Sequence, residues 1–402
     1  MTTTILITLC SLLLIAYLFD LTSSLTKIPS VLLLLLLGWL VKETSGFFNI
    51  NIPDLSGFLP FLGTVGLILI VLDGSLELEF NASKKSVIKK SFLLAVVPIT
   101  ILAFFLALLF TYMGAGISFK DSLMNAIPFC VISSSVAISS VKNLSQDDSE
   151  FIIYESSFSD ILGVLFFNFI ALNSVINIDS VLHFTLQLAL ITVVSFIATF
   201  SLSYLLGVIQ HPIKFVPIIL LVMLIYAVSE VFHLQALIFI MLFGLFLGNL
   251  NELTRVKWLL WLKPRELRYE VRRFKELIRE ITFIIKAMFF LLFGYVLQKE
   301  EILNPKTILI ATGIVIAIFL FRLLTIRILK LPINPLFFIA PRGLITILLF
   351  LAILPSRSVF FINRSLVIQV IILTSLVMMG GFVFGGKKSS AKTVTIPETA
   401  EA

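Results

Sequence analysis

The chain has 402 residues, of which 59% are hydrophobic and only 13% are charged, and its mean hydropathy is +1.11. These values exclude a soluble globular protein, in which about 25% of residues are charged. The net charge of +7 does not indicate nucleic-acid binding, because the basic residues follow a membrane pattern. Cys10 and Cys130 lie far apart in apolar stretches and predict neither a disulfide nor a metal site.

Thirteen apolar segments are long enough to span a membrane as helices, which requires about 20 mostly apolar residues. They are centred near residues 12, 34, 66, 101, 131, 163, 196, 224, 241, 290, 317, 343 and 374. No Lys or Arg precedes Leu6, so the first segment lacks the basic start of a signal peptide, and we expect an uncleaved helix. The pattern predicts an all-α polytopic membrane protein with about 13 transmembrane helices.

The connections between the segments differ in charge. If the N-terminus is outside, the inner connections carry 21 of the 30 Lys and Arg residues, and the outer connections carry 6. Because inner loops are enriched in Lys and Arg, we expect the N-terminus outside and the C-terminus in the cytoplasm.

The longest polar stretch covers residues 251–280, where apolar residues recur at helical spacing between basic ones. We expect an amphipathic helix over residues 252–280 on the cytoplasmic face of the membrane. A helix that binds a partner protein is the alternative. Residues 387–402 are polar and predict a short cytoplasmic tail without an appended regulatory domain.

The fifth and twelfth segments contain residues that interrupt helices. The fifth has Pro128 and five serines within residues 133–140, and the twelfth has Pro332, Pro335 and Pro341. Proline removes a backbone donor, and serine hydroxyls compete for backbone partners. Paired interruptions in two halves are typical of transporters with inverted repeats, so broken helices 5 and 12 are expected to meet at a site. Ordinary packed helices that tolerate Ser and Pro are the alternative.

Asp160 lies in the middle of the sixth apolar segment, where a charge costs several kcal/mol and is usually functional. Burial of a carboxylate favours its protonated form, so a proton and a cation can compete for this group. Ser156 lies one helical turn earlier, so its hydroxyl could share a cation. Glu155 is about 140° round the helix from Asp160 and points to another neighbour.

Several motifs resemble those of the monovalent cation/proton antiporter superfamily, in particular the sodium/proton exchangers of NhaP type. Glu155–Asp160, Glu-Ser-Ser-Phe-Ser-Asp, resembles the family's Glu-Ser-Leu-Leu-Asn-Asp. Pro341–Ile347 resembles the Arg-Gly-Ala-Leu-Ser motif of the twelfth helix, and Leu72–Leu78 resembles Phe-Glu-Gly-Gly-Leu of the third. Arg322 falls where the family has an arginine on the eleventh helix.

The resemblance implies that Asp160 binds the transported cation and proton. The hydroxyl residues it places around this carboxylate are Ser133, Ser134, Ser156 and Ser159. It also implies an ion pair between Glu155 and Arg322 close to the site. For each serine that could be a ligand, a packing role is the alternative.

Four other charged residues are candidates for roles near the site. Arg342 could neutralise the carbonyl end of a half-helix. Lys286 either faces the site or extends to the cytoplasmic surface. Asp73 and Glu230 are lesser candidate acids.

The sequence departs from the family at two positions. Ser133-Ser134-Ser135 replaces the usual Thr-Asp-Pro, so one acid is missing, and Ser159 replaces the Asn before the key Asp. The first change puts the affinity for sodium in question, and the second bears on the number of protons exchanged.

The resemblance further implies two bundles joined by a linker. The expected boundaries are residues 1–90 (dimerisation bundle, helices 1–3), 91–178 (core, helices 4–6), 179–212 (linker helix 7), 213–300 (dimerisation bundle, helices 8–10) and 301–386 (core, helices 11–13).

We therefore expect an antiporter that exchanges Na⁺ or K⁺ for protons, in the bacterial inner membrane, as a homodimer surrounded by lipid. No P-loop, GxSxG or dinucleotide fingerprint occurs, so no enzyme activity, cofactor or nucleic-acid partner is expected. One alternative is a ligand-gated potassium efflux system whose regulatory domain is a separate subunit. The other is a sensor or scaffold that keeps the fold without transport.

Overall fold

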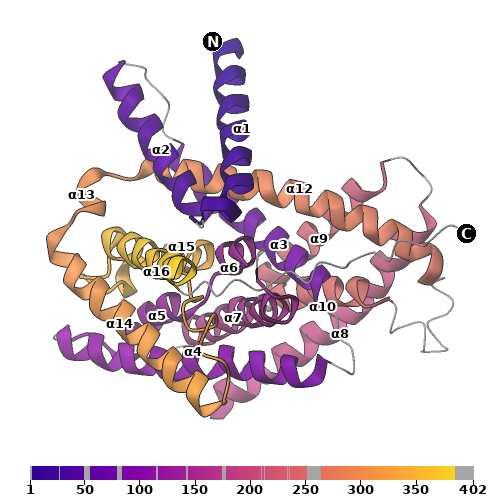
Figure 1. The fold of residues 1–402 in the computed structure, drawn as a ribbon. Coiled ribbons are helices and arrows are strands. Elements are labelled where there is room, and N and C mark those ends of the chain that lie inside the picture. Colours follow the sequence, from indigo (N-terminus) through magenta and orange to yellow (C-terminus); the bar gives the residue numbers. More distant parts are fainter. Residues whose placement is uncertain are drawn as a thin grey trace, which may run out of the picture.

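The computed structural model describes residues 2–26, 28–48, 55–78, 84–114, 116–141, 144–173, 178–209, 211, 213–232, 234, 236–250 and 264–384. Within these ranges the regular structure is helical and contains no strand (Figure 1). A helix satisfies its backbone polar groups internally, which an apolar chain in lipid requires.

The helices of the first half are α1 (Thr2–Thr26), α2 (Ser30–Phe47), α3 (Leu59–Glu77), α4 (Lys85–Met113), α5 (Phe119–Cys130), α6 (Ser134–Ser140) and α7 (Gln146–Leu172). Those of the second half are α8 (Ile178–Val208), α9 (Phe215–Val231), α10 (Ala236–Gly248), α12 (Pro264–Val296), α13 (Lys299–Ile302), α14 (Pro305–Ile328), α15 (Leu344–Leu351) and α16 (Arg364–Phe384). In the described ranges, two short 3-10 helices, η1 (Ser56–Phe58) and η4 (Pro355–Arg357), join longer elements.

The predicted all-α membrane fold is confirmed. Each predicted segment centre falls within a helix, except residues 131 and 343, which fall where the chain is broken. The described ranges contain nine spans that are long and apolar enough to cross a membrane, one of which, Phe119–Ser140, comprises α5, the break after it and α6. The helices α9 and α10 are shorter. The number of thirteen spans therefore stays a prediction.

The amphipathic stretch differs from its predicted form. Residues 252–263 lie outside the described residues, and residues 264–280 are the first part of α12, which continues without a break into the tenth segment. Its apolar side chains Leu267, Phe274 and Ile278 are fully buried. Phe274 contacts Phe215 of α9 and Phe243 of α10, with ring centroids 5.9 Å and 6.4 Å away. The apolar face thus packs on protein, whereas the prediction placed it on lipid.

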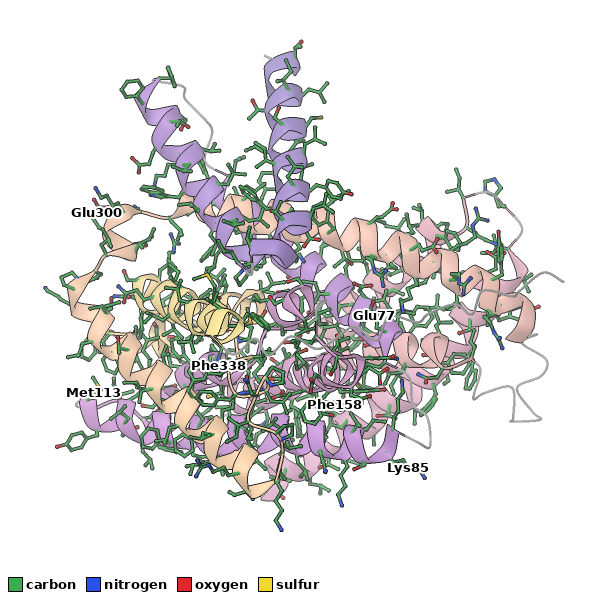
Figure 2. All side chains as sticks on the ribbon, in the orientation of Figure 1. Glu77, Lys85, Met113, Phe158, Glu300 and Phe338 are labelled. Atoms are coloured by element: carbon green, nitrogen blue, oxygen red, sulfur yellow. The ribbon has the colours of Figure 1, made fainter. Side chains whose placement is uncertain are left out.

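Packing divides most of the helices into two groups. The crossing group comprises α4–α7 and α14–α16, and the scaffold group comprises α2, α3, α8–α10 and α12. Figure 1 shows α3 between α12 and the crossing group, and α3 contacts α6, α7 and α15. In the crossing group, Phe158 of α7, labelled in Figure 2, packs edge-on against Phe92 of α4, with ring centroids 5.4 Å apart.

Candidate functional site

The first broken segment separates α5 from α6. Val131, Ile132 and Ser133 are not helical, and the backbone donors of Ile132 and Ser133 find tertiary partners. The N–H of Ile132 donates to Ser159 Oγ at 2.8 Å, and the N–H of Ser133 donates to Pro341 O at 2.9 Å. Unwound backbone inside a membrane protein is stable only when such partners exist.

The second broken segment precedes α15 and covers residues 331–343. The sequence predicted an interruption of a helix at this point. The structure instead has a long non-helical segment, in which residues from Asn334 to Phe338 form turns. The N–H of Arg342 donates to Thr374 Oγ1 of α16 at 3.1 Å. The prolines in this stretch lack donors, so they leave fewer backbone groups to satisfy.

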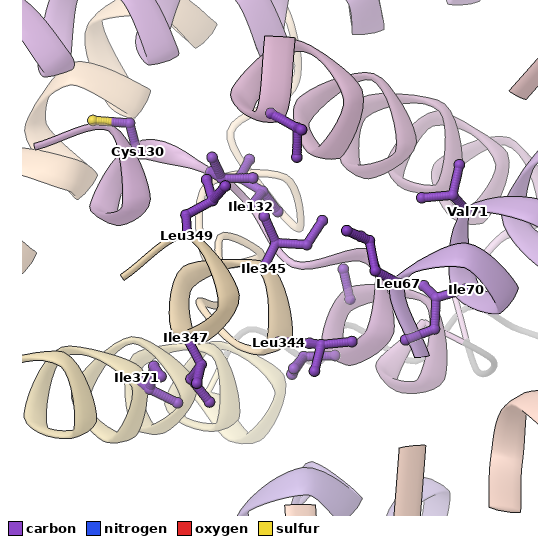
Figure 3. Packing of buried hydrophobic residues seen from close by; sticks show 14 of the residues in the cluster. Leu67, Ile70, Val71, Cys130, Ile132, Leu344, Ile345, Ile347, Leu349 and Ile371 are labelled. Atoms are coloured by element: carbon purple, nitrogen blue, oxygen red, sulfur yellow. The ribbon is translucent and has the colours of Figure 1, made fainter. Parts of the chain in front are cut away.

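The two broken segments cross next to Ser133 and Gly343. Besides the Ser133–Pro341 hydrogen bond, a Cβ atom placed on Gly343 would lie 2.7 Å from Ser133 Oγ and 3.0 Å from Val136 Cγ2. A side chain at this position would therefore require Ser133 or Val136 to shift. Figure 3 shows the apolar residues around the crossing, including Ile132 of the first break and Ile345 of α15.

Arg342 is buried and bridges the two segments. Its Nε donates to Phe129 O, in the last turn of α5, at 2.6 Å, and its Nη1 donates to Ala340 O at 2.9 Å. A cation at the carbonyl end of a helix is stabilised by the unsatisfied carbonyls and the helix dipole. The half-helix whose end Arg342 neutralises is therefore α5.

Asp160 lies on α7 beside the start of α6 and is 2% exposed. The hydroxyl and the backbone N–H of Ser134, the first residue of α6, face this carboxylate. Asp160 Oδ1 is buried and has no hydrogen-bond partner among the described residues. A buried carboxylate oxygen without a partner is costly, and binding of a proton or a cation relieves that cost.

The other predicted serine ligands have different partners. Ser156 is fully buried and its hydroxyl donates to Ile153 O at 3.3 Å. Ser133 Oγ and Ser135 Oγ lie 2.9 Å apart. Ser159 accepts the N–H of Ile132, so it holds the broken segment against α7. Among the predicted hydroxyls, Ser134 is the one that the structure brings to Asp160.

Glu155 and Arg322 form a buried ion pair between α7 and α14. The Arg322 Nη1–Glu155 Oε1 distance is 2.5 Å and the Nη2–Oε2 distance is 3.0 Å, so both carboxylate oxygens are engaged. Arg322 Nε also donates to Leu336 O of the second broken segment at 2.8 Å. The side chains are 1% and 2% exposed. The pair thus ties α7, α14 and the second broken segment together.

The remaining candidates lie elsewhere. Asp73 is on α3, with its Oδ1 buried and unpartnered among the described residues, and Lys286 of α12 is in its electrostatic environment. Glu230 is exposed near the end of α9, beside Tyr226. In the described part of the chain no group of three or more His, Cys, Asp or Glu residues could hold a metal ion.

Two buried polar residues were not predicted. Thr374 accepts the N–H of Arg342, and Ser157 has a buried hydroxyl without a partner among the described residues. Thr374 could have been found from the sequence, because Thr374 and Ser375 form a pair of hydroxyl residues at the centre of an apolar segment. Ser157 was visible inside the Glu155–Asp160 motif.

Ser159→Ala is expected to destabilise the first broken segment. It removes the acceptor of the Ile132 N–H, and a buried unsatisfied donor costs about 1–3 kcal/mol. The melting temperature of the purified protein should fall, and Ser159→Thr should restore it. Ser157→Ala is the matched control, because its hydroxyl has no partner in the described residues. Equal melting temperatures for Ser159→Ala and Ser157→Ala would contradict this role of Ser159.

A family model described as sodium/hydrogen exchanger, transmembrane, matches residues 10–385. A structure of the sodium proton antiporter MjNhaP1 from Methanocaldococcus jannaschii at pH 8 is similar, with a TM-score of 0.71 and 17% identity, over 94% of this chain and 99% of that chain. An electron-microscopy structure of the same antiporter gives a TM-score of 0.65 and 18% identity, over 95% of each chain. The comparison with curated protein sequences gives no match.

Proposed function

The chain belongs to the sodium/hydrogen exchanger family, and we propose that it exchanges Na⁺ or K⁺ for protons at Asp160. Its family is one of transporters, and exchange driven by an ion gradient needs no cofactor. The observation that carries the proposal is the buried Oδ1 of Asp160, which has no partner among the described residues and lies beside two crossing broken segments. Ser134 holds the carboxylate, and Glu155–Arg322 and Arg342 hold the segments around it.

The proposed cycle uses competition between two ligands. A proton and a cation cannot occupy the same carboxylate oxygen together, and a bare carboxylate crosses a low-dielectric barrier only at high cost. The site therefore changes sides only when Asp160 is neutralised by one ligand or the other. The crossing group moves against the scaffold group in an elevator-type step, and the scaffold group forms the contact between two copies of the chain. The separation of the helices into two packing groups supports this step.

The missing family acid supports a second candidate. Ser134 stands at that acid's position and faces Asp160, so the site contains one carboxylate where relatives have two. A protein that keeps the fold and senses ions without transporting them is the alternative, as is a potassium efflux subunit controlled by a separate ligand-binding subunit. Cation-dependent proton movement distinguishes transport from sensing.

The test is a pH-dye assay in everted membrane vesicles from cells that express the chain. Sodium, potassium and lithium salts are added in turn to vesicles that are acidic inside. We expect at least one cation to release internal protons, compared with vesicles that lack the chain. No response to any of the three cations would favour the sensing alternative.

We further propose that the protein lies in the bacterial inner membrane with its N-terminus outside and its C-terminus in the cytoplasm. The distribution of Lys and Arg supports this orientation. Reporter fusions or cysteine labels at Lys84 and Arg272 should report the cytoplasmic side. A periplasmic signal at both positions would contradict the orientation.

Exchange is expected to be electroneutral, one proton for each monovalent cation. Asp160 is the one acid expected to change its protonation in each cycle, because Glu155 is held by Arg322 and Ser159 replaces the residue that is acidic in electrogenic relatives. Lys286 is the group that could add a second proton. Transport rates in proteoliposomes should not respond to an imposed membrane potential at fixed ion gradients, and a clear response would refute one-to-one exchange.

A further inference from the structure

Glycines make two kinds of helix contact in this protein. Inside the scaffold group they meet backbone: a Cβ on Gly38 of α2 would overlap Leu291 O of α12, and one on Gly294 of α12 would overlap Leu35 O of α2. Gly248 of α10 approaches α3 in the same way, 2.8 Å from Leu76 O. Backbone atoms cannot rotate aside, so these contacts fix the scaffold helices relative to one another.

The glycines of α3 that face the crossing group meet side-chain tips instead. A Cβ on Gly63 would overlap Leu348 Cδ2 of α15, and one on Gly66 would lie 3.6 Å from Leu344 Cδ2 of the same helix. Gly63 thus forms a seat for Leu348, which is the space that its missing side chain leaves for the leucine. Gly66 forms a looser seat for Leu344, because a Cβ there would be in ordinary contact with Leu344 and equally close to Ile285 Cγ2 of α12, at 3.6 Å. A leucine tip can change rotamer and leave its seat, which backbone cannot do. Figure 3 shows Leu344 close to Leu67 and Ile70 of α3.

The spacing of the two glycines and that of the two leucines differ by about 1.5 Å, which is small beside one helical turn of about 5.4 Å. Gly63 and Gly66 are three residues apart, about 4.5 Å along a helix, and Leu344 and Leu348 are four residues apart, about 6 Å. The two helices run in opposite directions here, since Gly63 meets Leu348 and Gly66 meets Leu344. A slide of α15 along α3 by about one turn, 5.4 Å, therefore brings one leucine to the seat that the other has left.

We propose that Gly63, Gly66, Leu344 and Leu348 form a two-position ratchet between scaffold and crossing group, whose two registers correspond to the two orientations of the ion site. Packed interfaces tend to be bistable, and one-turn slides of this kind occur where one element moves past another. The inference rests on the proposed transport cycle, because it assigns the two registers to that cycle. α15 begins directly after the crossing at Gly343, so its slide moves the crossing as well.

Cysteine pairs test the ratchet directly. In a Cys10→Ala, Cys130→Ala background, the in-register pairs are Gly63→Cys with Leu348→Cys and Gly66→Cys with Leu344→Cys. The pairs one turn out of register are Gly66→Cys with Leu348→Cys and Gly63→Cys with Leu344→Cys. We expect oxidation in membranes to cross-link an in-register pair and also at least one out-of-register pair. Cross-linking of in-register pairs alone, or of no pair, would overturn the ratchet.

The yield of cross-linking is read on gels and does not depend on exchange. Absence of cation-dependent proton movement in the uncross-linked background would therefore count against the proposed function, while the cross-linking pattern still decides the ratchet. Where exchange is present, we expect cross-linking in either register to stop it and a reductant to restore it. Full exchange by a cross-linked protein would overturn the assignment of the registers to the cycle.

Alanine variants supply the matched controls. Gly63→Ala fills a seat and should slow exchange about tenfold, because overpacking disfavours a register that the cycle must visit. Adding Leu348→Ala removes the overlapping tip and should recover most of the rate. Gly313→Ala, in α14 with open space around its Cβ, should leave the rate unchanged. If Gly63→Ala exchanges ions as fast as Gly313→Ala does, the cycle does not depend on the space that Gly63 leaves for Leu348.

Discussion

Replacement of Glu155 or Arg322 by alanine is expected to lower the free energy of unfolding by about 3–5 kcal/mol, because each single change leaves one buried charge without its partner. Both carboxylate oxygens of Glu155 are bound by Arg322, and the two side chains are almost completely buried. Loss of Arg322 also removes the donor to Leu336 O, which holds the second broken segment. Arg322→Ala should therefore be the more harmful of the two.

The double variant Glu155→Ala/Arg322→Ala should recover part of the stability, since neither charge is then left alone. Melting temperatures of the purified variants in one detergent measure the effect. Glu150→Ala is the control, because its ion pair with Lys84 is partly exposed and such pairs contribute only about 0–1 kcal/mol. If the losses of the two single variants simply add in the double variant, the pair does not act as one unit.

The sequence predicts best what depends on local pattern. Apolar runs of about 20 residues predict spans, and the prolines and serines near Pro128 and Pro341 predict the two breaks. Asp160 is conspicuous as a charge in the middle of an apolar segment. The Glu155–Arg322 pairing came from the direction of Glu155 on its helix together with the family motif.

The parts that the sequence did not predict depend on tertiary contacts. Ser133, Ser134 and Ser135 lie at a break, where helical periodicity does not say which hydroxyl faces Asp160. Thr374 is 32 residues from Arg342, and one threonine in an apolar helix also fits simple packing. The amphipathic pattern of residues 264–280 is the same whether its apolar face meets lipid or protein, so the pattern could not reveal that α9 and α10 cover it.

Asp160→Asn is expected to abolish exchange while leaving the fold intact. The amide has the shape of the carboxylate and can still accept from Ser134, but it carries no charge and cannot release a proton. The variant site is permanently neutral, so it can change sides without coupling a cation to a proton. We expect normal expression and a melting temperature no lower than that of the wild type.

The pH-dye assay should give no sodium-, potassium- or lithium-dependent signal for Asp160→Asn. Glu150→Gln removes a carboxylate of α7 far along the helix from the site, and it should retain exchange. Wild-type-like exchange by Asp160→Asn would remove the basis for this site assignment. Loss of exchange in both variants would point to a general effect of lost charge.

The central claim is that a proton and a cation compete for one carboxylate, and the pH dependence of cation affinity tests it most directly. In proteoliposomes that contain the wild-type chain, the apparent KM for the transported cation is measured at a series of pH values equal on both sides. Simple competition predicts that KM rises as pH falls, by about tenfold for each pH unit once the site is mainly protonated, while the maximal rate stays constant. A KM that does not change with pH, with a maximal rate that does, would contradict competition at Asp160.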